Sequence, residues 1–440
     1  MNPDRGDPES LAENLRICAT RRHDSCYACG DTPNEKPMQI LFAHQNFPAQ
    51  FGDFGTYLAR TGWDVAFVTA AEGAKPPPGC RMVKMTPHRD PTQGVHRFAY
   101  NLEKAMINAQ AFANAAIRAR GEGLNPDVVV AHSGWGSGTF AKAVWPHTKF
   151  VAYVEWFYRY PPVDAVQAPA PQTEEDGRAQ ALARNTPTLL DLAEADLVFC
   201  PSRFQASQFP RKLSRDMVIM HDGVDTDFHA PSDNPVLPEA VKSLPADAEI
   251  VTYATRGMEL HRGFPEFMRA LARLQAERPK LHAIIVGQDR IAYGPSREDG
   301  RGWKEAMREE LDLDESRIHW TGLLPRKQYL GVLQAADVHV YLSVPFVLSW
   351  SMIEAMSIGC PLVASDTPPV REAATDGEDA LLVDHSDTEA LARSVARLLD
   401  DRSLADRLGR TARRTAIRNY SASWIWPWRD RVLGELVRAG

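Results

Sequence analysis

The chain has few cysteines, no long apolar run and no cleavable-signal pattern. Its 440 residues include six scattered cysteines, which argues against the disulfide framework of a small secreted protein. No apolar stretch approaches the roughly 20 residues that cross a bilayer. The polar N-terminus also lacks the apolar core of a secretory signal. These absences predict a cytoplasmic protein without a transmembrane segment, for which peripheral membrane contact remains open.

An excess of basic residues is missing too. Lys plus Arg number 50 against 57 for Asp plus Glu, a net charge of −7, so bulk binding to nucleic acid is not expected. A hydrophobic content of 44% with 24% charged residues is typical of a globular protein. The length exceeds what one hydrophobic core usually supports, so we expect two domains.

Common catalytic signatures are absent as well. The sequence contains no G-x-x-x-x-G-K-[ST], no H-E-x-x-H and no G-x-S-x-G. These patterns mark P-loop NTPases, zinc proteases and serine esterases, so their absence counts against all three classes.

The first 37 residues differ from the rest of the chain. They are polar and precede a strong strand signal at Met38, which could itself be the translation start. One cluster within them could hold zinc tetrahedrally, through Cys18, His23, Cys26 and Cys29. A single C-x-x-C without a second pair is weak support for such a site. We expect residues 1–37 to be a disordered extension.

From Met38 onward, short apolar runs alternate with helical stretches. The first half has runs at 40–43, 65–69, 128–131, 150–154, 197–200 and 218–220. After a Pro- and Asp-rich lapse around 225–244, a second series follows at 250–253, 283–286, 318–321, 338–341, 361–364 and 381–383. Buried strands separated by helices indicate parallel sheets covered on both faces. The predicted fold is α/β, with two doubly wound Rossmann-like domains facing across a cleft.

The domain limits follow from this pattern. We expect an N-terminal domain over 38–225 and a C-terminal domain over 226–417. The aromatic segment Trp424-Ile-Trp-Pro-Trp428 should pack against something, so residues 418–440 are expected to return to the first domain. In such sheets ligands bind beyond the carboxyl ends of the strands.

The segment 341–366 is the most informative. It reads as strand, loop, helix, glycine stop and second strand, with Glu354 just inside the helix. A helix N-terminus offers free N–H groups to phosphate, and a nearby carboxylate can take the two hydroxyls of a ribose. Without any ligand, Ser351 and Glu354 also fit a capping box, in which each side chain satisfies a backbone donor of the other. Both interpretations stay open here.

Other candidates also follow strands. Arg256 and Arg262 could clamp a diphosphate or be solvated surface residues. His132 ends a strand before the glycines at 134, 136 and 138. It could bind a sugar or phosphate, or it could be a satisfied core histidine. Gly52 and Gly55 would allow a ligand to approach the end of the first strand.

Several of these segments, in this order, resemble those of one enzyme family. They are PDVVVAHSGWG, FCPSRFQASQFP, IMHDGVDTDFHAP, YATRGMELHRGF, IHWTGLLPRKQYLGVLQAADVHVYLS and SMIEAMSIGCPLVASD. From Met38 to its end the chain is similar to the family-4 retaining glycosyltransferases of GT-B architecture, the glycosyl transferases group 1. Two departures stand out. Phe346 replaces the first of the family's paired glutamates, which touches the donor sugar, and Arg262 is a cation displaced by one residue from the family's lysine.

The resemblance implies transfer of a sugar from a nucleoside diphosphate sugar to an acceptor hydroxyl, with retention of configuration. The donor site would comprise Arg256, Arg262, Leu324 in the base-binding loop, Ser349, Trp350, Ser351 and Glu354. Catalytic roles would fall to His132, Arg256 and Arg262. The acceptor side would contain Gln50, Gly52, Gly55 and His132.

The partners implied are a nucleotide-sugar donor and a glycan, lipid-linked or small-molecule acceptor, with no nucleic acid. Asp225-Thr226-Asp227 resembles the metal-chelating D-x-D of other sugar-transfer enzymes, but it lies in the expected linker, so neither metal nor cofactor is expected. A catalytically impaired nucleotide-sugar-binding protein, or a sugar-nucleotide epimerase of the same fold, remains the alternative.

Overall fold

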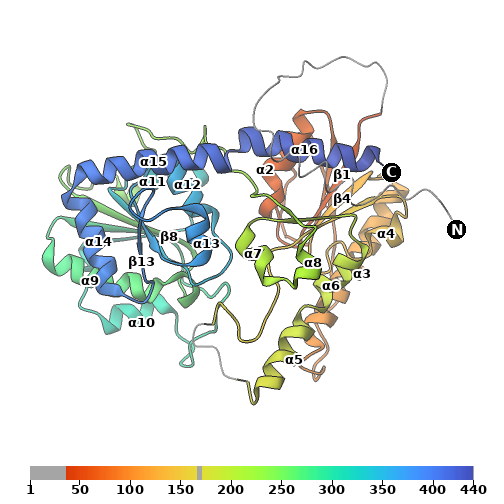
Figure 1. Cartoon of the computed structure of the whole chain (residues 1–440), viewed down its shortest axis with the longest axis horizontal. Coiled ribbons are helices and arrows are strands. Elements are labelled where there is room, and N and C mark those ends of the chain that lie inside the picture. The colour runs from red at the N-terminus through yellow and green to blue at the C-terminus, as the bar shows by residue number, and fades with distance from the viewer. Residues whose placement is uncertain (1–35, 166–170, 440) are drawn as a thin grey trace.

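Two parallel-sheet α/β domains lie side by side in the computed structural model, which describes residues 36–165 and 171–439. In Figure 1 the first domain is red to yellow-green and the second is green to blue. The predicted fold class is therefore confirmed. Residues 1–35, with the cysteine and histidine cluster considered for zinc, lie outside the described ranges.

The first sheet has seven strands in the order β3-β2-β1-β4-β5-β6-β7. Every pairing is parallel, with Ile40 beside Val65 and Val128 for example. The strands are β1 Gln39–Ala43, β2 Asp64–Thr69, β3 Cys80–Lys84, β4 Val128–His132, β5 Lys149–Tyr153, β6 Leu197–Cys200 and β7 Val218–Ile219. The helices are α2 Gly52–Arg60, α3 Tyr100–Gly121, α4 Ala141–Val144, α5 Glu174–Arg184, α6 Thr186–Glu194, α7 Arg203–Gln208 and α8 Arg211–Ser214.

The second sheet has six strands in the order β10-β9-β8-β11-β12-β13, again all parallel. They are β8 Glu249–Gly257, β9 Leu281–Gln288, β10 Ile318–Gly322, β11 Val338–Tyr341, β12 Leu362–Ser365 and β13 Leu381–Val383. One face is buried against α9 Phe264–Glu277, α10 Trp303–Glu310 and α14 Thr388–Asp400. The other face is buried against α11 Arg326–Gln334, α12 Trp350–Ile358 and α13 Pro368–Ala373.

The chain crosses between the domains at two adjacent points. Val224 forms an isolated bridge with Ser421, where helix α15 (Arg402–Tyr420) gives way to α16 (Ala422–Arg438). Both helices run along one edge of the molecule in Figure 1, α15 over the second domain and α16 over the first. Val432, Leu433 and Leu436 of α16 are buried in the same core cluster as residues of β1 and β2.

Two details of the first domain differ from the sequence prediction. Strand β3 was not predicted, because it lies at the sheet edge with most of its side chains partly or fully exposed, so it lacks a continuous apolar run. Helix α2 begins at Gly52, within the segment expected to be a loop. Over the described ranges, none of the helices has the length and apolar character needed to cross a membrane.

Candidate functional site

Arg262 is a buried cation with no ion-paired carboxylate in the described part of the chain. It ends the short 3-10 helix after β8 and is 8% exposed. Its Nη1 donates to Ser343 Oγ at 2.9 Å, to the Val347 carbonyl at 3.1 Å and to Tyr341 Oη at 3.4 Å. Among the described residues, neither Nη2 nor Nε has a hydrogen-bond partner, and no acidic group lies within ion-pair distance. A buried charge without a counter-charge is costly, so this guanidinium is prepared for an anion.

Arg256 approaches the same region from the end of β8, where it is exposed. The pairing of β8 with β9 is irregular here: the three steps from Ala254 to Gly257 lie opposite the two from Val286 to Gln288. One extra residue is therefore accommodated as a bulge, a device that redirects side chains next to functional sites. Arg256 lies within this bulge, next to the end of the strand.

Helix α12 starts at Trp350, and the loop before it contacts the Arg262 side chain through the Val347 carbonyl. Its N-cap is Ser349, whose hydroxyl accepts from the Ser351 N–H and lies 3.0 Å from the Ser351 hydroxyl. The capping box of Ser351 and Glu354 is therefore wrong, because the N-cap lies two residues earlier, at Ser349, and Glu354 lies beyond the first turn of the helix. The indole N–H of Trp350 donates to Asp222 in the first domain at 3.2 Å, and the side chain is partly exposed.

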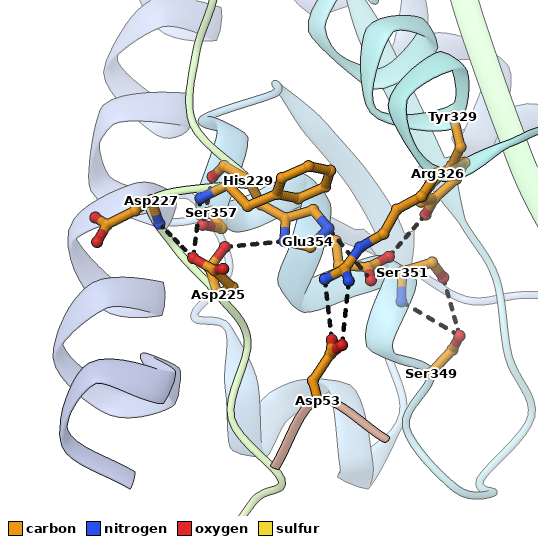
Figure 2. A network of polar contacts seen from close by, with 11 residues as sticks. Asp53, Asp225, Asp227, His229, Arg326, Tyr329, Ser349, Ser351, Glu354 and Ser357 are labelled. Atoms are coloured by element: carbon orange, nitrogen blue, oxygen red, sulfur yellow. Dashed lines mark hydrogen bonds and ion pairs between the residues drawn. The ribbon is translucent and has the colours of Figure 1, made fainter. Parts of the chain in front are cut away.

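Both carboxylate oxygens of Glu354 have protein partners, as Figure 2 shows. Tyr329 donates its hydroxyl to Glu354 Oε2 at 3.0 Å, and His229 Nε2 lies 3.5 Å from Oε1. Burial and the Glu354 charge raise the pKa of Tyr329 well above its usual value, so Tyr329 stays a donor. The Glu354 side chain is 16% exposed. It is thus a fixed carboxylate with some access to solvent.

The loop before α11 carries Leu324, another predicted donor residue. Leu324 and Tyr329 are partly buried against the same apolar cluster, which contains Val286 and Val332. The first residue of α11, Arg326, reaches across to Asp53 of the first domain, 3.0 Å between Nη2 and Oδ2. Both side chains are about half exposed, and Figure 2 shows this pair in front of Glu354 and Ser351.

In the first domain, His132 is part of a paired cluster. Its Nε2 lies 2.9 Å from Glu155 Oε2 and its Nδ1 lies 3.1 Å from the Ser133 carbonyl. Glu155 also accepts from Gln50 Nε2 at 2.9 Å. Burial acts to raise the pKa of Glu155, but the bonds from His132 and Gln50 outweigh it and the pKa is lowered. Both ring nitrogens of His132 thus lie within hydrogen-bond distance of oxygen atoms.

His44 lies next to this cluster, with its ring centroid 4.7 Å from that of His132. Its Nδ1 accepts from the Asn46 N–H at 2.8 Å. Burial, followed by the charges of His132 and of Arg256 in the other domain, lowers the pKa of His44 to about 2. His44 is therefore neutral, and Arg256 is close enough to act on it electrostatically across the domain boundary.

The two glycines assigned to the acceptor side do not provide space there. A side chain at Gly52 would meet Pro48 at 2.5 Å, and one at Gly55 would meet the ring of Phe67 at 2.4 Å. The prediction that they leave room for a ligand is wrong, because protein atoms fill that room. The carboxylate of Asp225 likewise serves the chain itself, since it accepts from the N–H groups of Asp227 and Phe228.

No group of three or more metal-binding side chains is present within residues 36–165 and 171–439. The structure brings Arg262, Ser349, Ser351 and Glu354 together on the second domain, with His132 and Gln50 on the first.

Comparison with known families agrees with this arrangement. Residues 61–229 match the model described as "Glycosyl transferase family 4 group", and residues 239–415 match "Glycosyl transferases group 1". The two matches follow each other along the chain, one over each domain. This chain belongs to the family-4, group 1 glycosyltransferases.

Named relatives point the same way. A D-inositol 3-phosphate glycosyltransferase of Streptomyces avermitilis is 30% identical over 234 residues, which are 51% of this chain and 49% of the relative. One from Corynebacterium efficiens is 27% identical and covers 83% of this chain and 85% of the relative. The chain thus spans about half the length of the first two curated relatives it matches, at 49% each.

Solved structures share the fold of this glycosyltransferase. Sucrose-phosphate synthase of Thermosynechococcus elongatus superposes with a TM-score of 0.70 at 20% identity, over 92% of this chain and 100% of that one. Anabaena HepE, solved in complex with UDP and glucose, gives a TM-score of 0.63 at 19% identity, over 90% of this chain and 99% of that one.

Sequence reasoning missed Glu155, Tyr329, His229 and the ion pair of Asp53 with Arg326. Of these, Glu155 carried a signal: it lies two residues after the end of strand β5, where this architecture places functional side chains. The partners of Glu354 carried none, because His229 and Tyr329 come from a linker and a helix far apart in the sequence.

Proposed function

We propose that this protein is a retaining glycosyltransferase that moves a sugar from a nucleoside diphosphate sugar to an acceptor hydroxyl. The observation that carries the proposal is Arg262, a buried guanidinium with one side open and no acidic partner among the described residues. A diphosphate supplies the missing negative charge, and its oxygens match the fork geometry of arginine.

The chain's own groups divide the work. Arg262 and Arg256 hold the diphosphate, together with the N-terminus of α12 at Ser349 and Ser351. Glu354 holds the ribose diol, and Leu324 belongs to the loop that contacts the base. His132 faces the reacting sugar from the first domain, and Gln50 supports it through Glu155.

In the reaction, the bond between the anomeric carbon and the outer phosphate oxygen breaks, and negative charge grows on the leaving diphosphate. Cations fixed in a site that excludes water stabilise this charge most in the transition state. The leaving phosphate then accepts the proton of the acceptor hydroxyl, whose oxygen bonds to the anomeric carbon on the same face. No metal ion or cofactor is needed for this scheme, so EDTA should leave activity intact.

The relatives support the donor class. They include D-inositol 3-phosphate glycosyltransferases and a phosphatidyl-myo-inositol mannosyltransferase, and HepE was solved with UDP-glucose. We extend to this chain only the shared chemistry: a nucleotide-sugar donor with a glycan, lipid-linked or small-molecule acceptor. We place the reaction in the cytoplasm, with peripheral membrane contact if the acceptor is lipid-linked.

The test has two stages. A thermal-shift screen against UDP, GDP, ADP and their sugars should raise the melting temperature with one base, since a ligand that binds only the folded state stabilises it. Release of free nucleoside diphosphate is then followed with candidate acceptors, with and without EDTA.

Other outcomes would contradict the proposal. Binding without turnover across a broad acceptor panel would favour a catalytically impaired binding protein, the alternative that Phe346 motivates. An isomerised nucleotide sugar without transfer would indicate an epimerase.

A further inference from the structure

Phe346 lies in a cluster of aromatic rings that spans both domains. Its ring centroid is 4.8 Å from that of Trp156 and 5.1 Å from that of Tyr293. Trp156 lies in the loop after β5, Tyr293 in the loop after β9 and Phe346 in the loop after β11. His261 adds an edge-on contact at 5.6 Å. We call Tyr293 and Phe346, which belong to the second domain, the aromatic wall.

The aromatic wall borders the proposed phosphate site directly. The guanidinium carbon of Arg262 lies 5.4 Å from the ring centroid of Tyr293 and 5.6 Å from that of Phe346. Tyr293 is 45% exposed and Phe346 is 9% exposed. A phosphate held by Arg262 is therefore close to these rings, and a group attached to it is within their reach.

A buried carboxylate fixes the wall in place. Glu259 is fully buried, and its Oε2 accepts from the N–H groups of Ala292, Tyr293 and Gly294 at 3.1, 2.9 and 2.8 Å. Three charge-assisted bonds hold the loop that carries Tyr293. On the other side, the carbonyl of Val347, next to Phe346, accepts from Arg262. Residues 259–262, which include Arg262, thus hold the loops that carry both rings.

The ring faces of the aromatic wall cannot hydrogen-bond a sugar hydroxyl as a carboxylate can. An aromatic face accepts no ordinary hydrogen bond from a hydroxyl, and a hydroxyl buried against it loses its bonds to water. A sugar face made of C–H groups loses no hydrogen bonds to water when it packs against the aromatic wall. A wall of this kind also discriminates weakly between a hydroxyl and its absence, whereas a site built to hydrogen-bond a hydroxyl rejects the analogue that lacks it by roughly 10⁴-fold or more.

Resting on the function proposed above, we propose that Phe346 and Tyr293 are specificity-determining residues for the donor sugar. They select a sugar that turns a C–H-rich face toward them, and they tolerate a deoxy position on that face. The substrate class is therefore a nucleoside diphosphate sugar with at least one ring position where loss of the hydroxyl is accepted.

The experiment compares donors on the base found in the thermal-shift screen. Calorimetry gives the dissociation constants of a nucleotide sugar and of its deoxy counterparts at C2, C3, C4 and C6, for the full chain and for Phe346→Gln. The ratio of the deoxy value to the parent value is the deoxy penalty, and it cancels any change in nucleotide affinity that the two ligands share. The matched controls are Phe346→Leu, which stays apolar, and Phe204→Leu, whose ring centroid lies 6.2 Å from that of Trp156.

We expect at least one deoxy donor with a penalty below about 3-fold in the wild type and above about 10-fold in Phe346→Gln, the scale of one hydrogen bond. Both leucine variants should keep the low penalty. If Phe346→Gln does not fold, Tyr293→Gln carries the test, because Tyr293 is exposed. Penalties above 10-fold at every position in the wild type, or equal penalties in wild type and glutamine variants, would overturn the inference. Absence of any nucleotide binding would instead overturn the proposed function.

Discussion

The two sides of the domain boundary carry charge in different ways. On the second domain, Arg262 is buried without a counter-charge among the described residues. On the first domain, His132 is paired with Glu155, which in turn accepts from Gln50. An unmatched buried charge is costly until a ligand neutralises it, whereas the polar groups on the first domain are already hydrogen-bonded to one another. We infer that the second domain binds the charged donor and the first domain positions what reacts with it.

Among the variants considered, Arg262→Ala should have the largest effect on nucleotide binding by the second domain. Removal of a charged hydrogen-bonding group should weaken binding of the nucleoside diphosphate by about 1.5–3 kcal/mol, about 10- to 150-fold. Calorimetry on the folded variant measures it. The control is Arg269→Ala in the same domain, since Arg269 forms a partly exposed ion pair with Glu310 and should change affinity by less than 2-fold. Equal affinities of wild type and Arg262→Ala would remove the basis of the comparison.

Glu354→Gln should follow, with a loss of about 1–2 kcal/mol in nucleotide affinity. The amide keeps the size of the side chain but cannot accept two hydroxyls as a carboxylate does. Wild type should therefore prefer the ribonucleotide over its 2′-deoxy form, and the variant should lose that preference. A preference of the same size in both proteins would assign Glu354 only to its contacts with Tyr329 and His229.

His44 gives a pH test on the first domain. Its pKa is about 2 in the folded protein and near 6.5 when unfolded. Below pH 6.5 the unfolded state therefore binds a proton that the folded state does not, so the free energy of unfolding falls as pH falls from 6.5 toward 2. The contribution is about 1.4 kcal/mol per pH unit.

His44→Asn retains an acceptor for the Asn46 N–H and removes the titration. Chemical denaturation between pH 5 and 6.5 should show a flatter slope in this variant, whereas the exposed His147→Asn should behave as wild type. An unchanged slope in His44→Asn would mean that His44 is protonated in the folded protein.

Glu155→Gln should sharpen the division of roles. We expect kcat to fall roughly 5-fold, which corresponds to a rise of about 1 kcal/mol in activation free energy. The affinity for free nucleoside diphosphate should be unchanged. A change in nucleotide affinity equal to the change in kcat would place Glu155 in donor binding instead.

The smallest effect is expected at the ion pair of Asp53 with Arg326. Both side chains are about half exposed, and exposed pairs contribute about 0–1 kcal/mol, which salt screens. Asp53→Asn should therefore leave the melting temperature nearly unchanged. A large loss of stability in this variant would show that the contact between the domains depends on this one pair.

Periodicity was sufficient to predict the two sheets, because their strands are short apolar runs buried on both faces. It failed for β3, whose edge position leaves several of its side chains partly or fully exposed. It also placed Gly52 and Gly55 in a loop. These glycines allow close contact with Pro48 and Phe67, and the sequence alone does not distinguish them from glycines that make room for a ligand.

The site was only partly predictable for a related reason. Arg262 and Glu354 stand next to strand and helix ends that the sequence marks. The pairing of His132 with Glu155 and of Glu354 with Tyr329 depends on where separate loops and helices meet in space. One sequence carries no direct record of such contacts.

The return of α16 to the first domain has a consequence for the order in which the protein can fold during synthesis. Domains generally fold as units while the chain emerges, but here Val432, Leu433 and Leu436 complete the core of the first domain. Each buried aliphatic side chain contributes about 1.5–3 kcal/mol. The sheet made first therefore keeps one face incompletely covered until the whole second domain has left the ribosome. The half that is translated earliest is the last to be finished.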